Sequence, residues 1–448
     1  MSSKSNFQMV IILSMLTGLL MGCSSSVKDP TETPSKLKIM YYDEMGYYSQ
    51  YGTLFAAMFP EIDVEVISKN NVKYEKGKDM NKAVMEFIDA KKPDLLMLNG
   101  EQYKNMSSQG KLYDLESFIK RDKFDLEGTV LGITDYIREL SDGKLYGMSP
   151  AFFSKAVYYN KDLFAKYEIP FPENGMSWDK LLQLASRFPT TGSEEERIYG
   201  IKTYYSDDLY ELGISMGGTL GLSFFNTSSM KMTMNSESWK AVFESALEAI
   251  KSETIYKGVN ESGNGSYESY LFQNPFVAGK VAMTIDENYL VNQITEAQER
   301  FKDKAISNWD MVTMPVNPQN PNVTNSMSID EIFAIDARSS NIDAAWNFIS
   351  YVNSDEFARI KKEVSTGSLT SRTKYITDES GHNLEALYSL KPIESSIYKD
   401  NEKLPYGLFS KIVVLMQEEL HKVTSERQSL SKALENIQAQ GQQLLDGK

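Results

Sequence analysis

The apolar stretch Pro93-Asp94-Leu95-Leu96-Met97-Leu98 is the third strand of an alternating series, and this series decides the fold. Before it come strand-like segments at 37–42 and 62–67, a helical segment at 53–59 between them, and a helix at 80–90. Strand, helix, strand, helix, strand predicts an α/β fold, a mainly parallel sheet with helices on both faces. Ligands of such sheets lie beyond the carboxyl ends of the strands, which here means Asp43-Glu44 and Asn99-Gly100-Glu101.

The N-terminal segment predicts export. Residues 1–22 contain one lysine and an apolar run over 9–20, which is too short to cross a bilayer and matches a signal-peptide core. Leu20-Met21-Gly22-Cys23 resembles the lipobox of bacterial lipoproteins, which implies a diacylglyceryl group on Cys23 and cleavage before it. We therefore expect a signal peptide at 1–22, a lipidated cysteine with a flexible tether at 23–36, and a place on the extracytoplasmic face of the cell membrane. The alternative, a buried free thiol, is disfavoured by the position of Cys23 after the apolar run.

The composition excludes several classes of function. The 448 residues include 61 acidic and 47 basic side chains, a net charge of −14, which argues against nucleic acid as a partner. A single cysteine allows no intramolecular disulfide. His382 and His421 have no metal ligands at useful spacing, so a zinc site or a histidine-based triad is close to excluded. We expect no metal and no cofactor, and carboxylates are the catalysts that remain possible.

Several ordered motifs resemble the extracellular solute-binding proteins of ABC importers. They are Gly110–Leu115, Gly143–Pro150, Val157–Phe164 with Gly175–Asp179 after it, Phe276–Thr284 and Asn341–Ile349. The resemblance is to the sugar-binding type that includes maltose-binding protein, in its Gram-positive lipoprotein form. It implies a two-lobed periplasmic-binding-protein-like fold (type II), with helices flanking both sheets and a hinged central cleft.

In that family the chain crosses between the lobes more than once. By position we expect crossings near 150–154, 284–287 and 328–331. One lobe would combine 37–151 with 287–329, and the other would combine 154–284 with 332–448.

A sugar site needs planar polar groups that pair with hydroxyls and aromatic faces that cover the ring. The four tryptophans lie in helix or strand patterns and are expected to be structural, so Tyr and Phe must supply the stacking faces. The resemblance places one such aromatic residue at Tyr289. We expect ligand contacts at Asp43, Glu44, Tyr47, Glu101, Gln102, Phe152, Phe153, Ser154, Tyr204, Tyr205, Asp286, Glu287, Asn288, Tyr289 and Tyr406.

Three further segments have a structural interpretation. Apolar residues at helical spacing over 408–445 predict two helices that pack on the second lobe, in preference to a coiled coil, because the period breaks near Thr424-Ser425. The glycine-rich segment 213–221 lacks the spacing of a phosphate loop and predicts a turn with close backbone approach. Arg372 is expected to brace a loop.

The leading hypothesis is capture without catalysis: a hinged monomer, attached to the membrane through lipid alone, binds a carbohydrate or related polar solute and delivers it to an ABC permease. Two alternatives remain open. One is a receptor that presents its ligand to a membrane sensor kinase, and the other is a lipid-anchored glycoside hydrolase that uses paired carboxylates.

Overall fold

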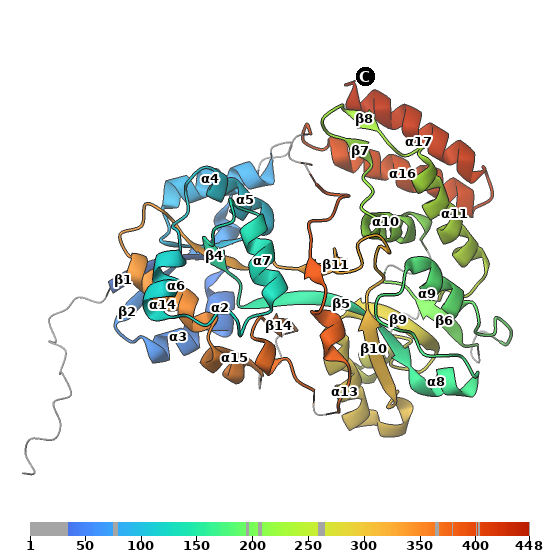
Figure 1. The fold of residues 1–448 in the computed structure, drawn as a ribbon, viewed down its shortest axis with the longest axis horizontal. Coiled ribbons are helices and arrows are strands. Elements are labelled where there is room, and N and C mark those ends of the chain that lie inside the picture. The colour runs from blue at the N-terminus through green and yellow to red at the C-terminus, as the bar shows by residue number, and fades with distance from the viewer. Residues whose placement is uncertain are drawn as a thin grey trace, which may run out of the picture.

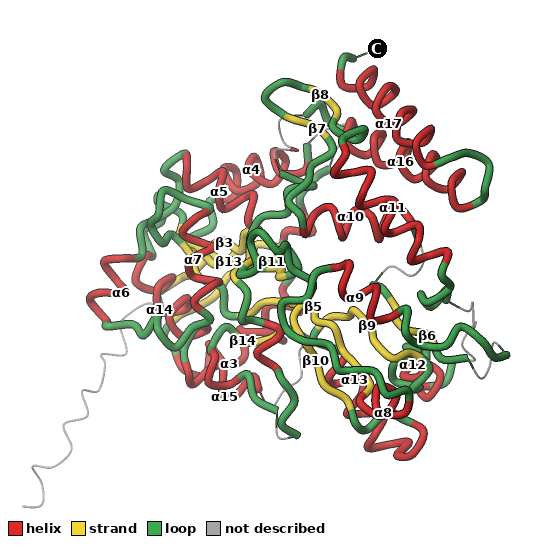
Figure 2. The backbone as a smooth tube through the Cα atoms, turned by 45° about the vertical axis from the view of Figure 1, so that its right-hand side comes forward, coloured by secondary structure: helices red, strands yellow, loops and turns green. Residues whose placement is uncertain are grey.

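The computed structural model describes residues 35–447, except 75–78, 194–196, 205–207, 259–264, 363–366, 379, 400 and 402–403. The described residues form two lobes that are joined around the long strand β5 (Ala151–Asn160) (Figure 1). Seen from a second direction, each lobe has strands inside and helices around them (Figure 2). The predicted two-lobed α/β fold is confirmed. The predicted signal peptide, Cys23 and the tether up to residue 34 lie outside the described residues.

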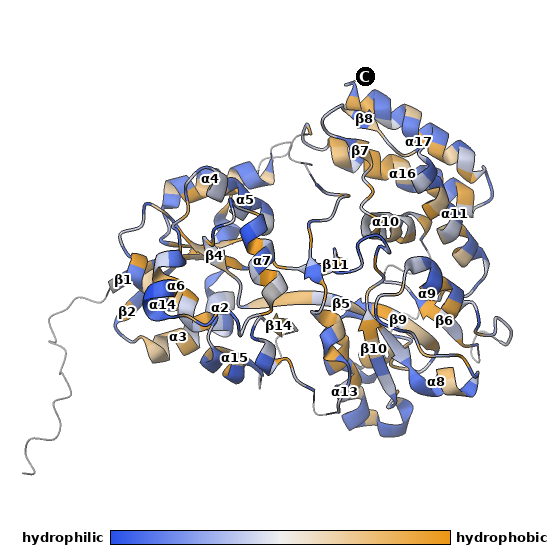
Figure 3. Ribbon diagram, in the orientation of Figure 1, coloured by the Kyte–Doolittle hydropathy of each residue, from blue (hydrophilic) through white to orange (hydrophobic). Residues whose placement is uncertain are grey.

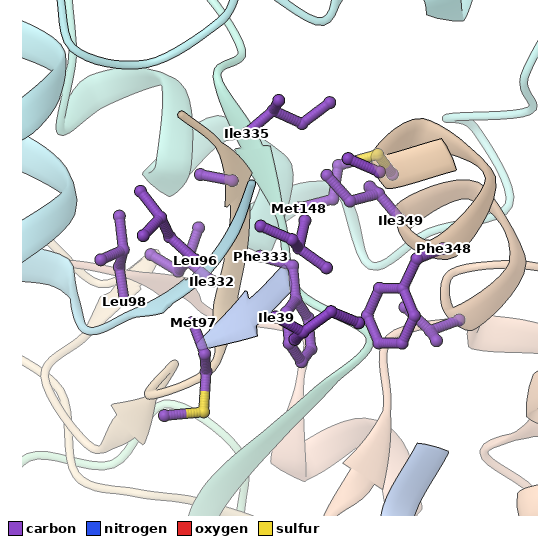
Figure 4. Packing of buried hydrophobic residues seen from close by; sticks show 14 of the residues in the cluster. Ile39, Leu96, Met97, Leu98, Met148, Ile332, Phe333, Ile335, Phe348 and Ile349 are labelled. Atoms are coloured by element: carbon purple, nitrogen blue, oxygen red, sulfur yellow. The ribbon is translucent and has the colours of Figure 1, made fainter. Parts of the chain in front are cut away.

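Lobe 1 contains a five-stranded sheet in the order β2-β1-β3-β13-β4. The strands are β1 (Ser35–Tyr41), β2 (Ile62–Ser68), β3 (Leu95–Leu98), β13 (Ile332–Ile335) and β4 (Gly147–Met148). β1 is parallel to β2 and β3, whereas β13 is antiparallel to β3 and β4. Every residue of β3 and β13 is buried, as expected for strands covered on both faces. Figure 4 shows Leu96, Phe333 and Phe348 within this core.

Helices surround the lobe 1 sheet and form the sides of the core. They are α2 (Glu44–Tyr47), the π-helix η1 (Tyr48–Gly52), α3 (Thr53–Met58), the 3₁₀-helix η2 (Lys69–Asn71), α4 (Met80–Lys91), α5 (Gly100–Ser108), α6 (Glu116–Asp122), α7 (Leu131–Glu139), α14 (Ile342–Val352), α15 (Asp355–Lys362) and the 3₁₀-helix η4 (Thr373–Tyr375).

Lobe 2 contains a sheet with the strand order β10-β5-β9-β6. β10 (Trp309–Thr313) and β9 (Val281–Glu287) are antiparallel to β5, and β6 (Tyr199–Lys202) is parallel to β9. The expectation of mainly parallel pairing therefore holds for β1–β3 but is wrong for lobe 2. Side chains alternate across β5, so Val157 belongs to the core on one face of the sheet and Ala156 and Tyr158 to the core on the other.

The remaining elements complete lobe 2 and the hinge. The lobe 2 helices are α8 (Lys161–Lys166), α9 (Trp178–Ala185), α10 (Leu209–Thr219), α11 (Glu237–Lys251), α12 (Tyr267–Phe272), α13 (Leu290–Phe301), η3 (Lys302–Lys304), η5 (Leu384–Leu387), α16 (Leu408–Thr424) and α17 (Leu430–Leu445). The short strands are β7 (Phe225–Asn226), β8 (Lys231–Met232), β11 (Val323–Thr324), β12 (Met327–Ser328), β14 (Leu369–Thr370) and β15 (Lys391–Pro392).

The hinge forms where three separate segments meet the start of β5. β12 and β14 pair with residues 151–154 of β5. Asn288, which follows β9, joins these segments, because its Oδ1 accepts from the Ser154 amide at 3.1 Å and its Nδ2 donates to the Gly367 carbonyl at 2.6 Å. A buried amide that satisfies two backbone groups holds the hinge segments in register.

The predicted lobe boundaries after residue 284 are wrong. The chain does not cross near 284–287, since α13 and β10 pack on the lobe 2 sheet. It returns to lobe 1 at 328–331, where β13 pairs with β3, so the range 332–376 belongs to lobe 1 with Trp346 and Ile376 in that core. The chain reaches lobe 2 again before η5. β4 belongs to the lobe 1 sheet and β5 to the lobe 2 sheet, so the chain passes between the lobes between Met148 and Ala151.

The three structural interpretations have different outcomes. α16 and α17 pack together on the lobe 2 core, as predicted. Arg372 braces a loop, since its guanidinium donates to Asp355 Oδ1 at 2.7 Å and to the Asp125 carbonyl at 2.6 Å. The prediction of a turn at 213–221 is wrong, because the residues up to Thr219 belong to the helix α10. Close approach is nevertheless the role of Gly217, where a Cβ would lie 2.3 Å from the Trp239 ring.

The hydropathy of individual residues differs between the central strand and the outer helices. Figure 3 shows hydrophobic residues along β5, whereas the outer helix α15 is mainly hydrophilic. All four tryptophans are buried, which confirms their predicted structural role. Among the described residues, no helix is both long and apolar enough to cross a membrane.

Candidate functional site

The carboxyl ends of β1, β2 and β3 supply polar and aromatic groups to the side of lobe 1 near the hinge. Tyr42 follows β1 and is 44% exposed, and the Lys69 ammonium lies 5.5 Å from the centre of its ring. Lys69 follows β2 and donates to the Met97 carbonyl of β3 at 3.4 Å. Asp43 caps α2 through the Gly46 amide at 2.7 Å and accepts from Asn70 at 3.3 Å. These groups form the lobe 1 wall.

Glu331 lies behind this wall, on the segment that returns from lobe 2. Its carboxylate accepts from the Tyr41 hydroxyl at 2.9 Å and from the Tyr51 hydroxyl at 2.5 Å. Burial, followed by the charge of Glu331, raises the pKa of both tyrosines, so they remain neutral donors. Burial lowers the pKa of Lys69, and the nearby Glu331 carboxylate opposes that effect. Glu331 of the hinge segment therefore holds Tyr41 and Tyr51 behind the lobe 1 wall, and its charge acts on Lys69 of that wall.

A second wall, in lobe 2, is built on β5 and β9. The Lys155 ammonium lies 3.5 Å from the centre of the Tyr204 ring, and the Tyr204 hydroxyl donates to Glu287 Oε1 at 2.7 Å. Phe153 is two residues before Lys155 on the same face of β5, and 38% of it is exposed. The cation over the ring and the hydrogen bond to Glu287 fix the orientation of Tyr204.

A cavity of about 180 Å³ extends from this wall into lobe 2. Lys155, Tyr204, Glu211 and the exposed Tyr398 line it, and Trp178 lies at its base, with its indole NH bonded to Thr219 Oγ1 at 3.0 Å. Burial lowers the pKa of Lys155, while Glu287, Asp286 and Glu211 oppose that effect. Burial, reinforced by Asp208, raises the pKa of Glu211. The cavity thus combines aromatic faces with charged donors and acceptors that are partly removed from water.

This arrangement suits the recognition of a neutral polyhydroxyl molecule. The rings of Phe153 and Tyr398, and the face of Tyr204 that Lys155 does not cover, can cover apolar C–H surfaces, while Lys155 and Glu287 can donate to and accept from hydroxyl groups. Among the described residues, no group of three or more His, Cys, Asp or Glu side chains could hold a metal ion.

Comparison with known proteins agrees with this geometry. Residues 56–387 match the family described as bacterial extracellular solute-binding protein, which is well over half of the chain. The chain belongs to the bacterial extracellular solute-binding proteins. Membership assigns it a binding role and no catalytic one, which removes the hydrolase alternative.

Individual relatives are more distant. A putative binding protein of Brucella abortus (strain 2308) is 30% identical over 217 residues, and this chain spans about half (47%) of that relative's length. A sugar transporter of Rhizobium etli in an open conformation has a TM-score of 0.61 at 20% identity, covering 91% of this chain and 99% of that one. The sugar-binding protein MalE of Xanthomonas citri has a TM-score of 0.63 at 15% identity, covering 92% and 98%. These two structures share the fold.

In this solute-binding protein, three of the predicted site residues lie together on the lobe 2 wall. They are Phe153, Tyr204 and Glu287. Asp43 lies on the lobe 1 wall, Glu44 is exposed in the first turn of α2, and Glu101 is exposed in the first turn of α5. Contacts of all of these residues with a ligand remain predictions.

Six of the residues that were predicted to contact a ligand are instead buried and hold the scaffold together. The prediction is corrected for these six. Tyr47 and Phe152 are fully enclosed in the lobe 1 core. Gln102 closes a capping box with Asn99 at the start of α5. The other three are at the hinge and on the opposite face of the lobe 2 sheet: Ser154, Asp286 and Asn288. Alternation along β5 and β9 turns these side chains away from Lys155.

The last three predicted residues are divided between the surface and the undescribed part of the chain. Tyr289 starts α13, is partly exposed and hydrogen-bonds to Asp286. Tyr406 is exposed in the turn before α16. Tyr205 lies outside the described residues.

Sequence reasoning missed several residues of both walls. Lys155 could have been found by extending the period-two pattern from Phe153, and Lys69 by applying the carboxyl-end rule to β2. Glu331 lies at a predicted crossing, but its tyrosine partners are distant in sequence. Tyr398 lies in an irregular segment that no local pattern predicts.

Proposed function

We propose that this chain is the lipid-anchored solute-capturing component of an ABC importer, and that its solute is a carbohydrate or a related polyol. The solute binds between the lobe 1 and lobe 2 walls, the hinge closes over it, and the closed protein delivers it to a membrane permease. Closure is a shift between two states that the solute biases through its contacts with both walls.

The observation that carries this proposal is the Lys155–Tyr204–Glu287 arrangement beside the exposed Phe153. A sugar ring offers hydroxyl groups at its edge and apolar C–H groups on its faces, and this wall offers partners for both. Further support is that the two fold relatives above carry the descriptions sugar transporter and sugar-binding protein. The net charge of −14 disfavours a polyanionic solute.

A thermal-shift screen of the purified chain with glucose, maltose, maltotriose and mannitol tests the solute class. A ligand that binds the folded state alone raises the melting temperature in proportion to the logarithm of its concentration. We expect at least one sugar to raise it. If no sugar does so while a peptide or an amine does, the carbohydrate assignment is wrong.

Matched variants test the place of binding. Tyr204→Ala removes the ring under Lys155 and the hydrogen bond to Glu287, so we expect its sugar affinity to fall about tenfold or more. Tyr267→Ala removes an exposed ring of α12, outside both walls, and should leave the affinity unchanged. Equal affinities of the two variants would place the solute elsewhere.

The anchor is tested separately. Cys23→Ala removes the lipid acceptor, so the chain should be released from the cell while its sugar affinity is retained. Membrane retention of this variant would contradict the lipobox interpretation.

A further inference from the structure

A second cavity lies on the other side of β5 from the lobe 2 wall. It has a volume of about 200 Å³ and is lined by residues of both lobes. Its lobe 1 side includes Phe357 and Lys361 of α15, and its lobe 2 side includes Asn292 of α13 and Leu387 of η5. Figure 1 shows β14, α15 and α13 on one side of β5, with β11 and α10 on the other. We call it the hinge cavity.

The charges of the hinge cavity differ from those of the chain as a whole. The chain has a net charge of −14, yet the described residues that line the cavity include Lys361 and Lys362 and no carboxylate. Lys361 bonds to neutral groups, with its ammonium 3.1 Å from the carbonyl oxygen and 3.0 Å from the side-chain oxygen of Gln50. The nearby Glu331 carboxylate accepts from the hydroxyls of Tyr41 and Tyr51.

The rest of the lining is amphipathic. Phe357 and Leu387 are buried apolar side chains, and Asn292 provides an amide on the lobe 2 side. Burial lowers the pKa of Lys361, with Glu331 opposing, so an anion next to the ammonium would recover part of the lost charge stabilisation. A ring of benzene size fits the cavity volume of about 200 Å³, because an apolar protein cavity of about 150 Å³ is large enough to bind benzene.

We propose that the hinge cavity binds a small organic anion, with its acidic group on the Lys361 ammonium and its apolar body against Phe357 and Leu387. Both lobes contact the bound anion. The hinge cavity and the capture site lie on opposite sides of the hinge strand, so closing the capture site widens the hinge cavity. An anion that holds the cavity together therefore weakens solute binding, a negative coupling between the two sites.

Benzoate is the probe that tests anion binding, and the measurement needs no solute. We expect saturable binding of benzoate to the full chain by calorimetry at millimolar concentration, and none of benzyl alcohol, which has the same ring without the charge. Lys361→Gln should weaken benzoate binding about tenfold or more, because a charge-assisted contact is lost. Asn292→Asp places a negative charge at the exposed lobe 2 side of the cavity and should also weaken it.

Lys240→Gln is the matched control, since it removes a lysine of α11 that lines neither cavity and should leave benzoate binding unchanged. Absence of saturable benzoate binding overturns the proposal, and so does equal binding by the wild type and Asn292→Asp. Because Asn292 is exposed, that variant decides the matter if Lys361→Gln fails to fold.

The coupling alone rests on the proposed function. With a sugar identified by the screen, saturating benzoate should raise the apparent Kd of the sugar in the wild type and not in Lys361→Gln. An unchanged or lower sugar Kd in a chain that binds benzoate overturns the coupling but leaves the anion site in place.

Discussion

Asn288→Ala should destabilise the protein through the hinge. The wild-type amide is 5% exposed and satisfies two backbone groups, the Ser154 N–H at 3.1 Å and the Gly367 carbonyl at 2.6 Å. The truncation leaves both without these partners. An unsatisfied buried polar group costs about 1–3 kcal/mol, and the Gly367 segment is only partly buried, so we expect a loss of about 2–4 kcal/mol.

Two measurements test this prediction. Urea unfolding followed by circular dichroism gives the change in midpoint, and an unchanged slope indicates that the two folded states expose similar surface. Hydrogen exchange should show faster exchange of the Ser154 amide. Asn320→Ala, at an exposed turn, is the control and should change stability by less than about 0.5 kcal/mol.

Asn288→Asp separates the two hydrogen bonds. The carboxylate keeps the acceptor for the Ser154 amide but faces the Gly367 carbonyl, so burial and repulsion raise its pKa above the unfolded value. The penalty is therefore present at pH 7 and is relieved as pH falls through the folded pKa and the group protonates.

The result that would refute the assigned role of Asn288 is a loss of stability below about 0.5 kcal/mol for Asn288→Ala, together with an unchanged exchange rate of the Ser154 amide.

Two further predictions concern the lobe 2 scaffold. Gly217→Ala should lower stability by about 1–3 kcal/mol in thermal unfolding, because its Cβ would lie 2.3 Å from the Trp239 ring and must displace α10 or α11; an unchanged melting temperature would contradict this packing. Burial raises the pKa of Glu419, but hydrogen bonds from Lys422, Asn436 and Gln428 outweigh it, so the net pKa is lowered. Its stabilisation is present above the unfolded pKa and is lost as pH falls through the folded one, so Glu419→Gln should destabilise at pH 7 and flatten the acid limb below about pH 4. Parallel acid limbs of the two proteins in pH-dependent unfolding would contradict this assignment.

Local apolar patterns were sufficient to predict much of the fold. The β1, α3, β2, α4 and β3 segments and the α16–α17 pair follow from the spacing of apolar residues, which depends on neighbours within one or two turns. The assignment of residues 332–376 to lobe 1 could not be predicted in this way. It depends on the pairing of β13 with β3, more than 230 residues apart in the chain.

The site was predicted as a region but not residue by residue. Phe152 and Phe153 are the same residue type and are adjacent in the sequence. The alternation of β5 nevertheless buries Phe152 in the lobe 1 core and leaves Phe153 exposed. Which face of β5 meets the solute depends on the lobe boundaries, and the sequence pattern did not establish these. The same limit explains why Asn288 was predicted to bind a ligand, whereas it holds the hinge.

Calorimetric titration of the full chain with the best sugar from the screen tests the central claim most directly, with the sugar recovered and analysed afterwards. We predict one sugar bound per chain, recovered intact, with binding weakened in Tyr204→Ala and unchanged in Tyr267→Ala. Cleavage of the sugar, or equal binding by these two variants, would contradict capture between the two walls.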